Sequence, residues 1–398
     1  MKSTGKKKAA VVGIAYTPIR KNLDGSIRDV AHMVIREALD DAGLTLDQVD
    51  SIYCAPPAMG GLPNFMFACQ LPEYLGAPVR NLSMIECGGV TALSNIKYAL
   101  CDIQTGVARV ALVFCLDKRF LDRMAVELDY FMRSSVTSMI NIYGSYCGPY
   151  GVGAPIPFYA LSAQRYMYEY GVSAEEIAEV PVRLRGNAVN NPKAMYSKPI
   201  NRKDVLASPM ISPPIHLLEC PAFASGAAAV VIVHPDVVSG LKRHPVWITG
   251  VGEYHHPSHF IPQHASITTF ESVAKAAEDA FEDADRKRDD VDVAEVYGVF
   301  AATELMIYED LGFFQKGKAA KAVMNGETAI DGRIAMNPSG GRLSMGHPAA
   351  ATPAIELAEI VSQLRGEAGP RQVKGANVGL IQAEHGMLNG CMVMILEN

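Results

Sequence analysis

Two glycine-containing turns hold the residues whose types best suit nucleophilic catalysis. Cys87 lies in the turn at residues 86–89, and His347 lies in the turn at residues 346–348. Each turn precedes a stretch expected to be helical, and the start of a helix presents unpaired N–H groups and a positive dipole. Such an end stabilises a thiolate or an enolate oxygen, and a thiol beside a histidine is readily activated. A cysteine taken alone is more often a small buried hydrophobe, so the interpretation depends on bringing the two turns together.

An internal duplication puts the two turns in equivalent positions. Residues 36–50 and 278–292 both predict an amphipathic helix with a polar end, followed by a strand. The residues Ala38, Asp41, Ala42, Asp47, Val49 and Asp50 recur as Ala280, Asp283, Ala284, Asp289, Val291 and Asp292. A repeat of this kind predicts two similar halves. If a pseudo-twofold axis relates the halves, the turns face each other and Cys87 meets His347.

Each half is predicted to run strand, helix, strand, turn, helix, strand. In the first half the expected strands are 9–15, 51–54 and 110–115, with a second helix at 91–105. In the second half the expected strands are 246–251, 294–300 and 378–382, with a second helix at 352–366. This alternation predicts mainly parallel sheets covered by helices.

The duplication divides the chain into an N-terminal half, residues 1–240, and a C-terminal half, residues 241–398. Within the first half, residues 117–225 are richer in Tyr, Pro and Met, and we interpret them as an inserted loop domain that covers the site. Its tyrosines suit ordinary packing or an aromatic substrate pocket. They are Tyr143, Tyr146, Tyr150, Tyr159, Tyr166, Tyr168 and Tyr170.

The composition excludes several classes of function. The chain has 398 residues, of which 49% are hydrophobic, and a formal net charge of −6. That charge argues against general binding to nucleic acid or to an anionic membrane. There is no run of 18 apolar residues, so no membrane-spanning helix is expected.

The cysteine and histidine patterns favour a protein without a metal of its own. None of the eight cysteines forms a CxxC pair, and several lie in apolar runs, which is typical of free thiols in a reducing, cytoplasmic compartment. His255, His256 and His259 cluster, but no acidic or cysteine ligand is near them in the sequence. A solvated or substrate-facing loop is therefore favoured over metal binding.

These motifs resemble the thiolase superfamily, in particular its sterol-carrier-protein type. Asn337-Pro338-Ser339-Gly340-Gly341 followed by Gly346-His347-Pro348 is similar to the histidine motif of that family. The opening strand around Val12-Gly13-Ile14 and the segment Ser225-Gly226-Ala227 also resemble thiolase segments, in the correct order. The resemblance implies an α/β thiolase fold: a duplicated αβαβα, five-layer architecture with an inserted loop domain, usually dimeric.

The resemblance also implies acyl-coenzyme A chemistry, with coenzyme A as a substrate. In the family a cysteine takes the acyl group, the Gly-His-Pro histidine activates it, and a second acid/base moves the proton at the α-carbon. Oxyanion holes hold the thioester oxygens. The candidate coenzyme A-binding residues are Gly340, Gly341, Gly386 and Ser225.

The chain departs from the family pattern in three places. Glu86 stands at the usual nucleophile position, and Cys87 follows it by one residue. Tyr297 replaces the usual Asn or His, and Glu384 with His385 stands where the family has a C-terminal acid/base cysteine. Tyr297 resembles the position used by cysteine-less, thiolase-like aldolases that cleave β-hydroxyacyl-CoA. Those enzymes lack the Gly-His-Pro histidine, which this chain keeps.

Three functions follow from these features. The leading hypothesis is a thiolase-type enzyme that cleaves a β-ketoacyl-CoA with coenzyme A or runs the reverse Claisen condensation. Cys87 would carry the acyl group, His347 would be its base, and His385 or Glu384 would move the α-carbon proton. The helix dipole and His347 are expected to lower the thiol pKa from about 8.5, against an opposing effect of Glu86.

The alternatives are a retro-aldolase and an inactive subunit. A retro-aldolase would use Tyr297 and His347 on a β-hydroxyacyl-CoA without a covalent intermediate. A catalytically inactive thiolase-like scaffold would explain Glu86 at the nucleophile position. We expect a homodimer, joined in some relatives by a small OB-fold, zinc-ribbon companion, and any such zinc would lie on the companion.

Overall fold

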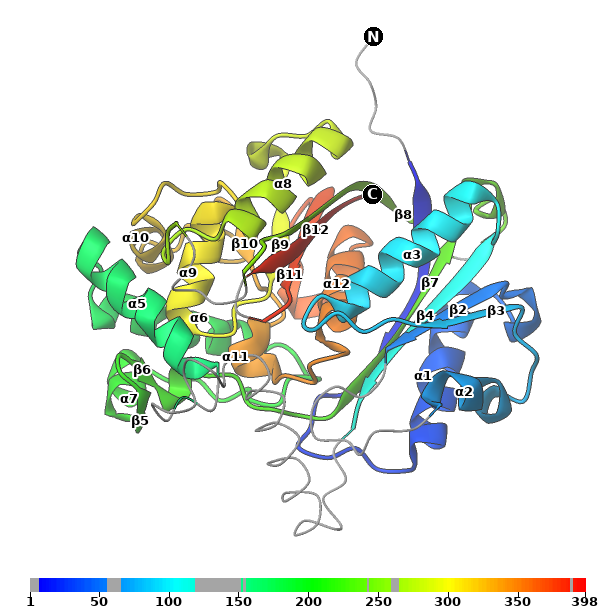
Figure 1. Ribbon diagram of the computed structural model, residues 1–398, viewed down its shortest axis with the longest axis horizontal. Coiled ribbons are helices and arrows are strands. Elements are labelled where there is room, and N and C mark those ends of the chain that lie inside the picture. The colour runs from blue at the N-terminus through cyan, green and yellow to red at the C-terminus, as the bar shows by residue number, and fades with distance from the viewer. Residues whose placement is uncertain are drawn as a thin grey trace.

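A computed structural model describes residues 7–55, 66–118, 152, 155–241, 243–258, 265–386 and 389–398. Its main feature is a ten-stranded sheet in the order β10-β9-β11-β12-β8-β1-β7-β4-β2-β3 (Figure 1). The strands of the first half are β1 (Ala9–Tyr16), β2 (Ser51–Ala55), β3 (Asn81–Met84), β4 (Val110–Asp117) and β7 (Gly226–Val233). Those of the second half are β8 (Val246–His255), β9 (Val293–Val296), β10 (Ala335–Met336), β11 (Val378–Glu384) and β12 (Gly390–Glu397).

The sheet consists of one strand arrangement used twice. The first half has the order β1-β7-β4-β2-β3, and the second half has the matching order β8-β12-β11-β9-β10. The halves join where β1 pairs with β8, with Ala9 opposite Ile248. The predicted duplicated fold is therefore confirmed. The proposed division after residue 240 falls in the connection between β7 and β8.

The expectation of mainly parallel sheets is wrong for half of the strand pairs in each half of the chain. The pairs β2–β3, β2–β4, β9–β10 and β9–β11 are parallel, whereas β7 and β12 run antiparallel to both of their neighbours. These two strands are last in their halves. β12 begins only a few residues after β11 ends, and so short a connection can join only antiparallel strands.

The residues that recur in the two copies make the same contacts in each half. Gly13 on β1 lies against α1 (Ile27–Ala42), and a Cβ there would come within 2.2 Å of the Ala38 carbonyl oxygen. Gly250 on β8 lies against α8 (Glu271–Ala284) in the same way, at 2.3 Å from the Ala280 oxygen. The alanines recur because a larger side chain would push the helix off the strand.

The recurring aspartates serve as anchors between strands. The Asp50 carboxylate accepts a hydrogen bond from the Val110 N–H at 3.1 Å, and Asp292 accepts one from Val378 at 3.0 Å. Each bond ties the residue just before one strand (β2 or β9) to the first residue of the neighbouring strand (β4 or β11). The short polar segment after each helix is therefore part of the sheet's hydrogen-bonding pattern.

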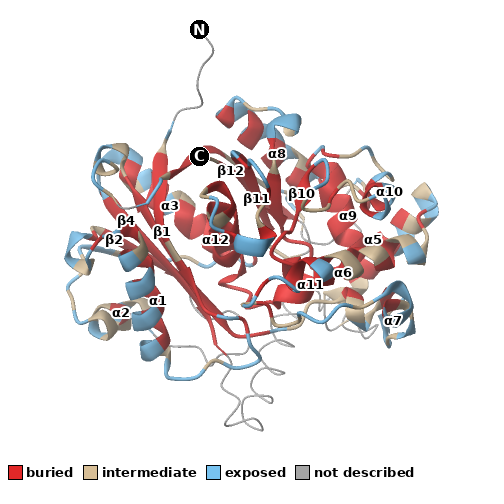
Figure 2. Cartoon of the chain, turned by 180° about the vertical axis from the view of Figure 1, so that it is seen from behind, coloured by how far each residue is buried: buried red, intermediate tan, exposed pale blue. Residues whose placement is uncertain are grey.

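Helices form three layers around the two halves of the sheet. The outer layers are α1 with α2 (Phe67–Leu75) on one side and α8 on the other. The central layer is α3 (Thr91–Thr105) and α12 (Thr352–Leu364), which pack against each other (Figure 1). Figure 2 shows α12 buried over most of its surface, whereas α1 and α2 expose their outer faces. The predicted five-layer arrangement is confirmed.

The described part of the insertion packs onto the second half. Its helices are α5 (Ile156–Tyr170), α6 (Ala174–Ala188) and α7 (Arg202–Ala207), followed by the short strands β5 (Met210–Ser212) and β6 (Ile215–His216). Of these, α5 contacts α9 (Ala301–Asp310), and α6 contacts α9, α10 (Ala319–Met324) and α11 (Gly341–Met345). Tyr143, Tyr146, Tyr150 and His259 lie outside the described residues.

In the part of the chain that the structure describes, no helix combines the length and the apolar character needed to cross a bilayer.

Candidate active site

The first turn is fastened both to its own helix and to the second half. The Cys87 N–H donates to Thr91 Oγ1 at 2.8 Å, and this hydroxyl donates to the Gly88 carbonyl at 2.6 Å. The Gly89 N–H donates to the carbonyl oxygen of His385 at 2.8 Å. Gly88 has φ +55°, and a Cβ there would lie 2.3 Å from that same oxygen. The glycines therefore permit a direct backbone contact between the halves.

A line of polar side chains begins at the Cys87 thiol. Its Sγ lies 3.5 Å from His385 Nε2, and the His385 ring lies against the His255 ring with centroids 4.5 Å apart. His255 Nε2 is 2.8 Å from a Glu253 carboxylate oxygen, and Glu253 also pairs with Lys97. Residues from the end of β11, from β8 and from α3 thus form one line that ends at the Cys87 sulfur, and His385 is the member of that line beside it.

Glu86 has a different orientation from its neighbour. Its side chain is exposed and accepts a hydrogen bond from the Gly88 N–H at 2.9 Å. The half-buried Cys87 side chain is the one that lies beside His385. Glu86 thus helps to hold the turn, and Cys87 faces the second half.

The expected lowering of the thiol pKa is wrong. Burial raises the pKa of the Cys87 thiol, and the negative charges of Glu253 and Glu86 raise it further. Lys97 acts in the opposite direction, but it is already paired with Glu253. The sequence pattern could not show this because Glu253 is remote from Cys87 along the chain.

The second turn is buried and contains fixed charges. His347 Nδ1 lies 3.0 Å from Arg342 Nη1 and 3.2 Å from Thr352 Oγ1. Arg342 in turn forms an ion pair with Glu356 at 3.0 Å, and the ring of Phe223 stacks on the imidazole with centroids 5.7 Å apart. Burial and the charge of Arg342 hold the pKa of His347 well below its usual range.

Tyr297 connects the two turns. Its hydroxyl lies 3.5 Å from His347 Nε2, and a Cβ on Gly89 would come within 2.5 Å of it. Burial raises the pKa of Tyr297, so the phenol remains protonated. A protonated phenol in this position can donate a hydrogen bond or a proton to a substrate oxygen.

The strand before Tyr297 is shorter than the predicted 294–300. β9 ends at Val296, whose N–H donates to Asn337 Oδ1 at 2.7 Å, and the Tyr297 N–H donates to Gln382 Oε1 at 2.9 Å. Side-chain oxygens here replace the carbonyls of a neighbouring strand. The chain therefore leaves the sheet at Tyr297 and directs its phenol toward the site.

Of the two candidate acid/bases at the end of β11, only His385 reaches the thiol. Glu384 is fully buried, and its oxygens accept hydrogen bonds from the Tyr159 hydroxyl at 2.9 Å and the Gly386 N–H at 2.6 Å. Tyr159 comes from α5, so the insertion holds Glu384 in place. No direct hydrogen bond joins Cys87 to His347 among the described residues, and the histidine beside the thiol is His385.

Most of the candidate coenzyme A-binding residues lie inside the protein. Gly340 is buried beneath α6, where a Cβ would lie 2.7 Å from the Ala188 Cβ, and Gly341 follows it with φ +56°. Ser225 is buried and donates to the Lys21 carbonyl at 3.2 Å. Gly386, with φ +111°, is partly exposed beside His385.

Sequence reasoning missed Arg342, Glu253 and Lys97. Arg342 had a local signal, because a charged residue within a run of glycine and apolar residues must be paired when that run is buried. Glu253 and Lys97 had none, since they belong to separate elements. His255, one of the predicted histidine cluster, reaches the site through its ring contact with His385. Among the described residues, no three His, Cys, Asp or Glu side chains group as metal ligands.

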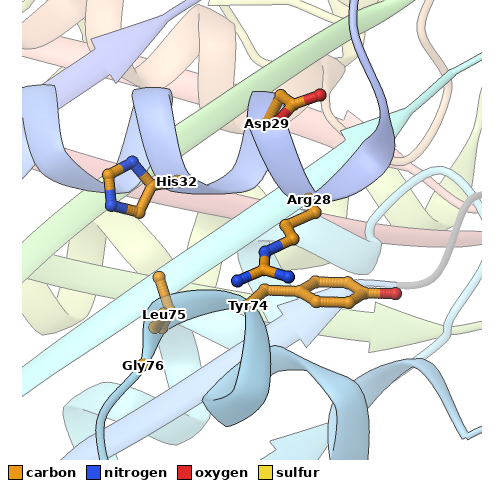
Figure 3. A pocket seen from close by; sticks show the side chains of 6 residues that line it. All are labelled: Arg28, Asp29, His32, Tyr74, Leu75 and Gly76. Atoms are coloured by element: carbon orange, nitrogen blue, oxygen red, sulfur yellow. The ribbon is translucent and has the colours of Figure 1, made fainter.

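A separate surface hollow lies between α1 and α2 (Figure 3). Its volume is about 310 Å³, and the Arg28 side chain extends from α1 toward Tyr74 of α2. It is lined by Arg28, Asp29, His32, Tyr74, Leu75 and Gly76. These residues belong to the outer helical layer, so the hollow is distinct from the two turns.

Comparisons with known proteins agree with this geometry. A family profile described as "Thiolase C-terminal domain-like" matches residues 252–398. An acetyl-CoA acetyltransferase of Methanothermobacter thermautotrophicus is 31% identical over 93% of this chain and 94% of its own. A 17-hydroxy-3-oxo-4-pregnene-20-carboxyl-CoA lyase of Mycobacterium tuberculosis is 29% identical over 90% and 92%. The solved structure of an Ltp2-ChsH2(DUF35) aldolase superposes with a TM-score of 0.83 and 25% identity, covering 98% of this chain and 97% of that one.

Proposed function

This chain belongs to the thiolase family, and from that premise we propose that it makes or breaks a carbon–carbon bond in an acyl-CoA by thiolase-type chemistry. The observation that carries the proposal is the Cys87 thiol, 3.5 Å from His385 Nε2, in a turn bonded to the second half. The protein would bind an acyl-CoA as one substrate and coenzyme A as the other.

In the proposed reaction His385 takes the proton of Cys87 and the sulfur attacks the β-carbonyl carbon of a β-ketoacyl-CoA. The bond between the α- and β-carbons then breaks. The former β-carbon stays on Cys87 as an acyl group, and the fragment that keeps the α-carbon and the original coenzyme A leaves as an enolate. The enolate takes a proton at its α-carbon, which His385 can supply. The thiol of coenzyme A next attacks the acyl-cysteine, releases a second acyl-CoA and restores Cys87. Condensation is the same sequence reversed.

Sulfur is the suitable acyl carrier because exchange between two thioesters is nearly neutral in energy. A carboxylate such as Glu86 would form a mixed anhydride, which is much higher in energy and is easily hydrolysed. Tyr297 and His347 lie together beside the first turn, at 3.5 Å from one another, and can hold the oxygen that gains negative charge.

A retro-aldolase is the second candidate, favoured by Tyr297 and by the likeness to an aldolase at a TM-score of 0.83. In that reaction a base removes the proton of a β-hydroxyl group, the bond between the α- and β-carbons breaks, and the resulting enolate takes a proton. No bond to Cys87 forms. Tyr297 and His347 would then bind the oxygens directly.

Intact mass after incubation with a series of β-ketoacyl-CoA and β-hydroxyacyl-CoA compounds tests the choice. The thiolase proposal expects an acyl adduct that is absent in Cys87→Ser, together with a loss of thiolysis of about 10⁴-fold or more. Cys101→Ser, which removes an exposed thiol on α3, is the matched control and should retain both. Turnover of the β-hydroxy compounds without an adduct would instead indicate the aldolase. The absence of both an adduct and turnover would indicate an inactive scaffold.

We further propose a homodimer, with a small zinc-ribbon companion as an additional subunit. β3 (Asn81–Met84) lies at one end of the sheet order and exposes Met84, and within the described ranges its outer edge pairs with no strand, so it can pair with a strand of a second copy. The companion is suggested by the related aldolase, whose name joins two components, Ltp2 and ChsH2. Light scattering that shows only a monomer at micromolar concentration would contradict the dimer.

A cytoplasmic location is the remaining part of the proposal. The described cysteines, among them the buried Cys54, Cys115 and Cys391, are free thiols, as expected in a reducing compartment. Fractionation of cells that produce the protein tests this point.

A further inference from the structure

Arg342 is a buried charge at the centre of the second turn. Its side chain is fully buried, and it makes three contacts through one guanidinium group. Nη1 lies 3.0 Å from His347 Nδ1, and Nη2 lies 3.0 Å from Glu356 Oε2. The central carbon lies 2.9 Å from the centre of the Tyr297 ring. Arg342 therefore touches both side chains that form the oxygen-binding part of the site.

The contact with Arg342 determines which nitrogen of His347 carries the proton. A guanidinium group donates hydrogen bonds and cannot accept them, so Nδ1 of His347 must present its lone pair to Nη1. The other neighbour, the Thr352 hydroxyl, donates to the Pro348 carbonyl at 2.8 Å and does not compete for the Nδ1 lone pair. In a neutral imidazole the proton then sits on Nε2, which faces Tyr297.

The doubly protonated form of His347 is disfavoured at this position. It would place an N–H on Nδ1 against the N–H of Arg342 and a second positive charge beside the first. Burial and Arg342 both hold the pKa of His347 well below its usual range. Glu356 faces Arg342 from α12 and partly balances its charge, but it makes no hydrogen bond to His347 among the described residues.

We propose that Arg342 is a positioning residue that locks His347 as a neutral Nε2–H donor, so that His347 binds a substrate oxygen and does not serve as the base for Cys87. A general base needs a lone pair directed at the proton that it removes. The single lone pair of this tautomer faces a permanent cation, whereas Nε2–H faces the site. The identity of the bound oxygen rests on the proposed acyl-CoA function; the tautomer does not.

The tautomer can be measured directly. Histidine-selective isotope labelling with proton–nitrogen correlation NMR distinguishes Nδ1–H from Nε2–H, and the His347 signals are identified by their loss in His347→Gln. We expect Nε2–H in the wild-type protein at neutral pH. A His347 found as Nδ1–H, or as the cation, would overturn the proposal whatever the activity.

Replacement of Arg342 tests its role. In Arg342→Met, Nδ1 is free to carry the proton and donate to Thr352, so we expect the Nδ1–H form and a fall in kcat of up to about 10²-fold with little change in KM. Arg342→Lys retains a cationic donor and should keep more of the Nε2–H form. Unchanged tautomer and unchanged kcat in Arg342→Met would overturn the proposal.

A matched buried arginine supplies the control. Arg371 pairs at 2.8 Å with Glu359, which lies on the same helix, α12, as Glu356. Among the described residues, Arg371 makes no hydrogen bond to His347. Arg371→Met should disturb the protein in a similar way and leave the His347 tautomer unchanged. If Arg342→Met does not fold, the double variant Arg342→Met/Glu356→Met removes both charges and allows the same measurement.

The outcomes separate this inference from the proposed function. The expected tautomer and its change in Arg342→Met would support the role of Arg342 even if no acyl adduct formed on Cys87. An adduct on Cys87 together with an Nδ1–H tautomer would support the thiolase function and overturn the role of Arg342.

Discussion

The turns at Cys87 and His347 occupy equivalent positions in the two halves but have opposite surroundings. In each, a threonine that begins the next helix donates a hydrogen bond back into the turn, Thr91 at 2.6 Å and Thr352 at 2.8 Å. Cys87 is half-buried, and the charges that act on it, Glu253, Glu86 and Lys97, lie on side chains that are at least partly exposed. His347 is buried, and its nearest charge is the fully buried Arg342. In the proposed function, one local structure thus supplies the acyl-carrying thiol in one half and an oriented hydrogen-bond donor in the other.

The difference arises from what covers each turn. The helices α5 and α6 of the insertion pack onto the second half, and α6 lies directly over Gly340. Charges buried there must be paired, as Arg342 is with Glu356, because an isolated buried charge is strongly unfavourable. The described part of the insertion leaves Cys87 partly exposed, as the proposed reaction of its thiol with coenzyme A requires.

The largest effect is expected from the loss of His347 in the buried second turn. His347→Ala removes an oxygen-binding donor, and we expect turnover to fall by about 10²–10⁴-fold while KM changes much less. Steady-state kinetics with circular dichroism to confirm folding is the measurement, and His234→Ala, at the surface, is the control. A loss below tenfold in a folded variant would remove His347 from the mechanism.

The buried half should also show a specific dependence of stability on pH. Glu304 lies beneath the second turn, accepting hydrogen bonds from Tyr308 and from Asn337 Nδ2 at 2.9 Å, and burial raises its pKa to about 7. Its folded pKa is higher than its unfolded pKa of 4.5, so folding favours the protonated form. Stability from this group is present at low pH and is lost as pH rises from 4.5 through about 7.

The size of this effect is roughly 3 kcal/mol, from the shift between the two pKa values. Glu304→Gln removes the titration, so denaturant unfolding should show a flatter decline in the free energy of unfolding between these pH values. Glu37→Gln, at an exposed position on α1, is the control and should keep the wild-type slope. Identical slopes in all three proteins would show that Glu304 does not titrate in this range.

A methyl group on Gly89 tests whether the first turn must touch Tyr297 and the end of β11. A Cβ on Gly89 would lie 2.1 Å from the Glu384 carbonyl oxygen and 2.5 Å from the Tyr297 hydroxyl. Gly89→Ala must therefore move the first turn away from both groups. We expect a loss of about 1–3 kcal/mol in stability and a fall in turnover. Gly186→Ala, in α6 with no atom within 4 Å of its new Cβ, should be neutral or stabilising. Full activity in Gly89→Ala would mean that the close contact of the first turn with Tyr297 and Glu384 is not needed for turnover.

The smallest effect concerns the charges around Cys87. Glu253→Gln removes a carboxylate that raises the thiol pKa, so the thiolate fraction at neutral pH should increase. We expect the rate of iodoacetamide labelling at Cys87 to rise about 2- to 10-fold at pH 7, and the difference to disappear at strongly alkaline pH. Cys101, which is exposed, is the internal reference. A slower reaction in the variant would mean that Glu253 activates the thiol through His255.

The duplicated fold could be predicted because its signals are local and repeated. Helical periodicity, the recurring alanines and aspartates, and the glycine-rich turns each depend on residues near one another in sequence. The helix at Thr91–Thr105 agrees with the prediction at both ends, and the strand at Val110–Asp117 was predicted only slightly short. The end of β9 was missed, since it depends on side chains of Asn337 and Gln382 that come from other elements.

By itself, the sequence determined that this protein has two similar halves, with Cys87 in one turn and His347 in the other. Only the tertiary structure decided which groups these side chains meet: His385 for the thiol, and Arg342 with Tyr297 for the imidazole. The reason is physical. Periodicity reports which face of a segment is buried, whereas a pKa or a tautomer depends on the nearest charges, and those come from other parts of the chain.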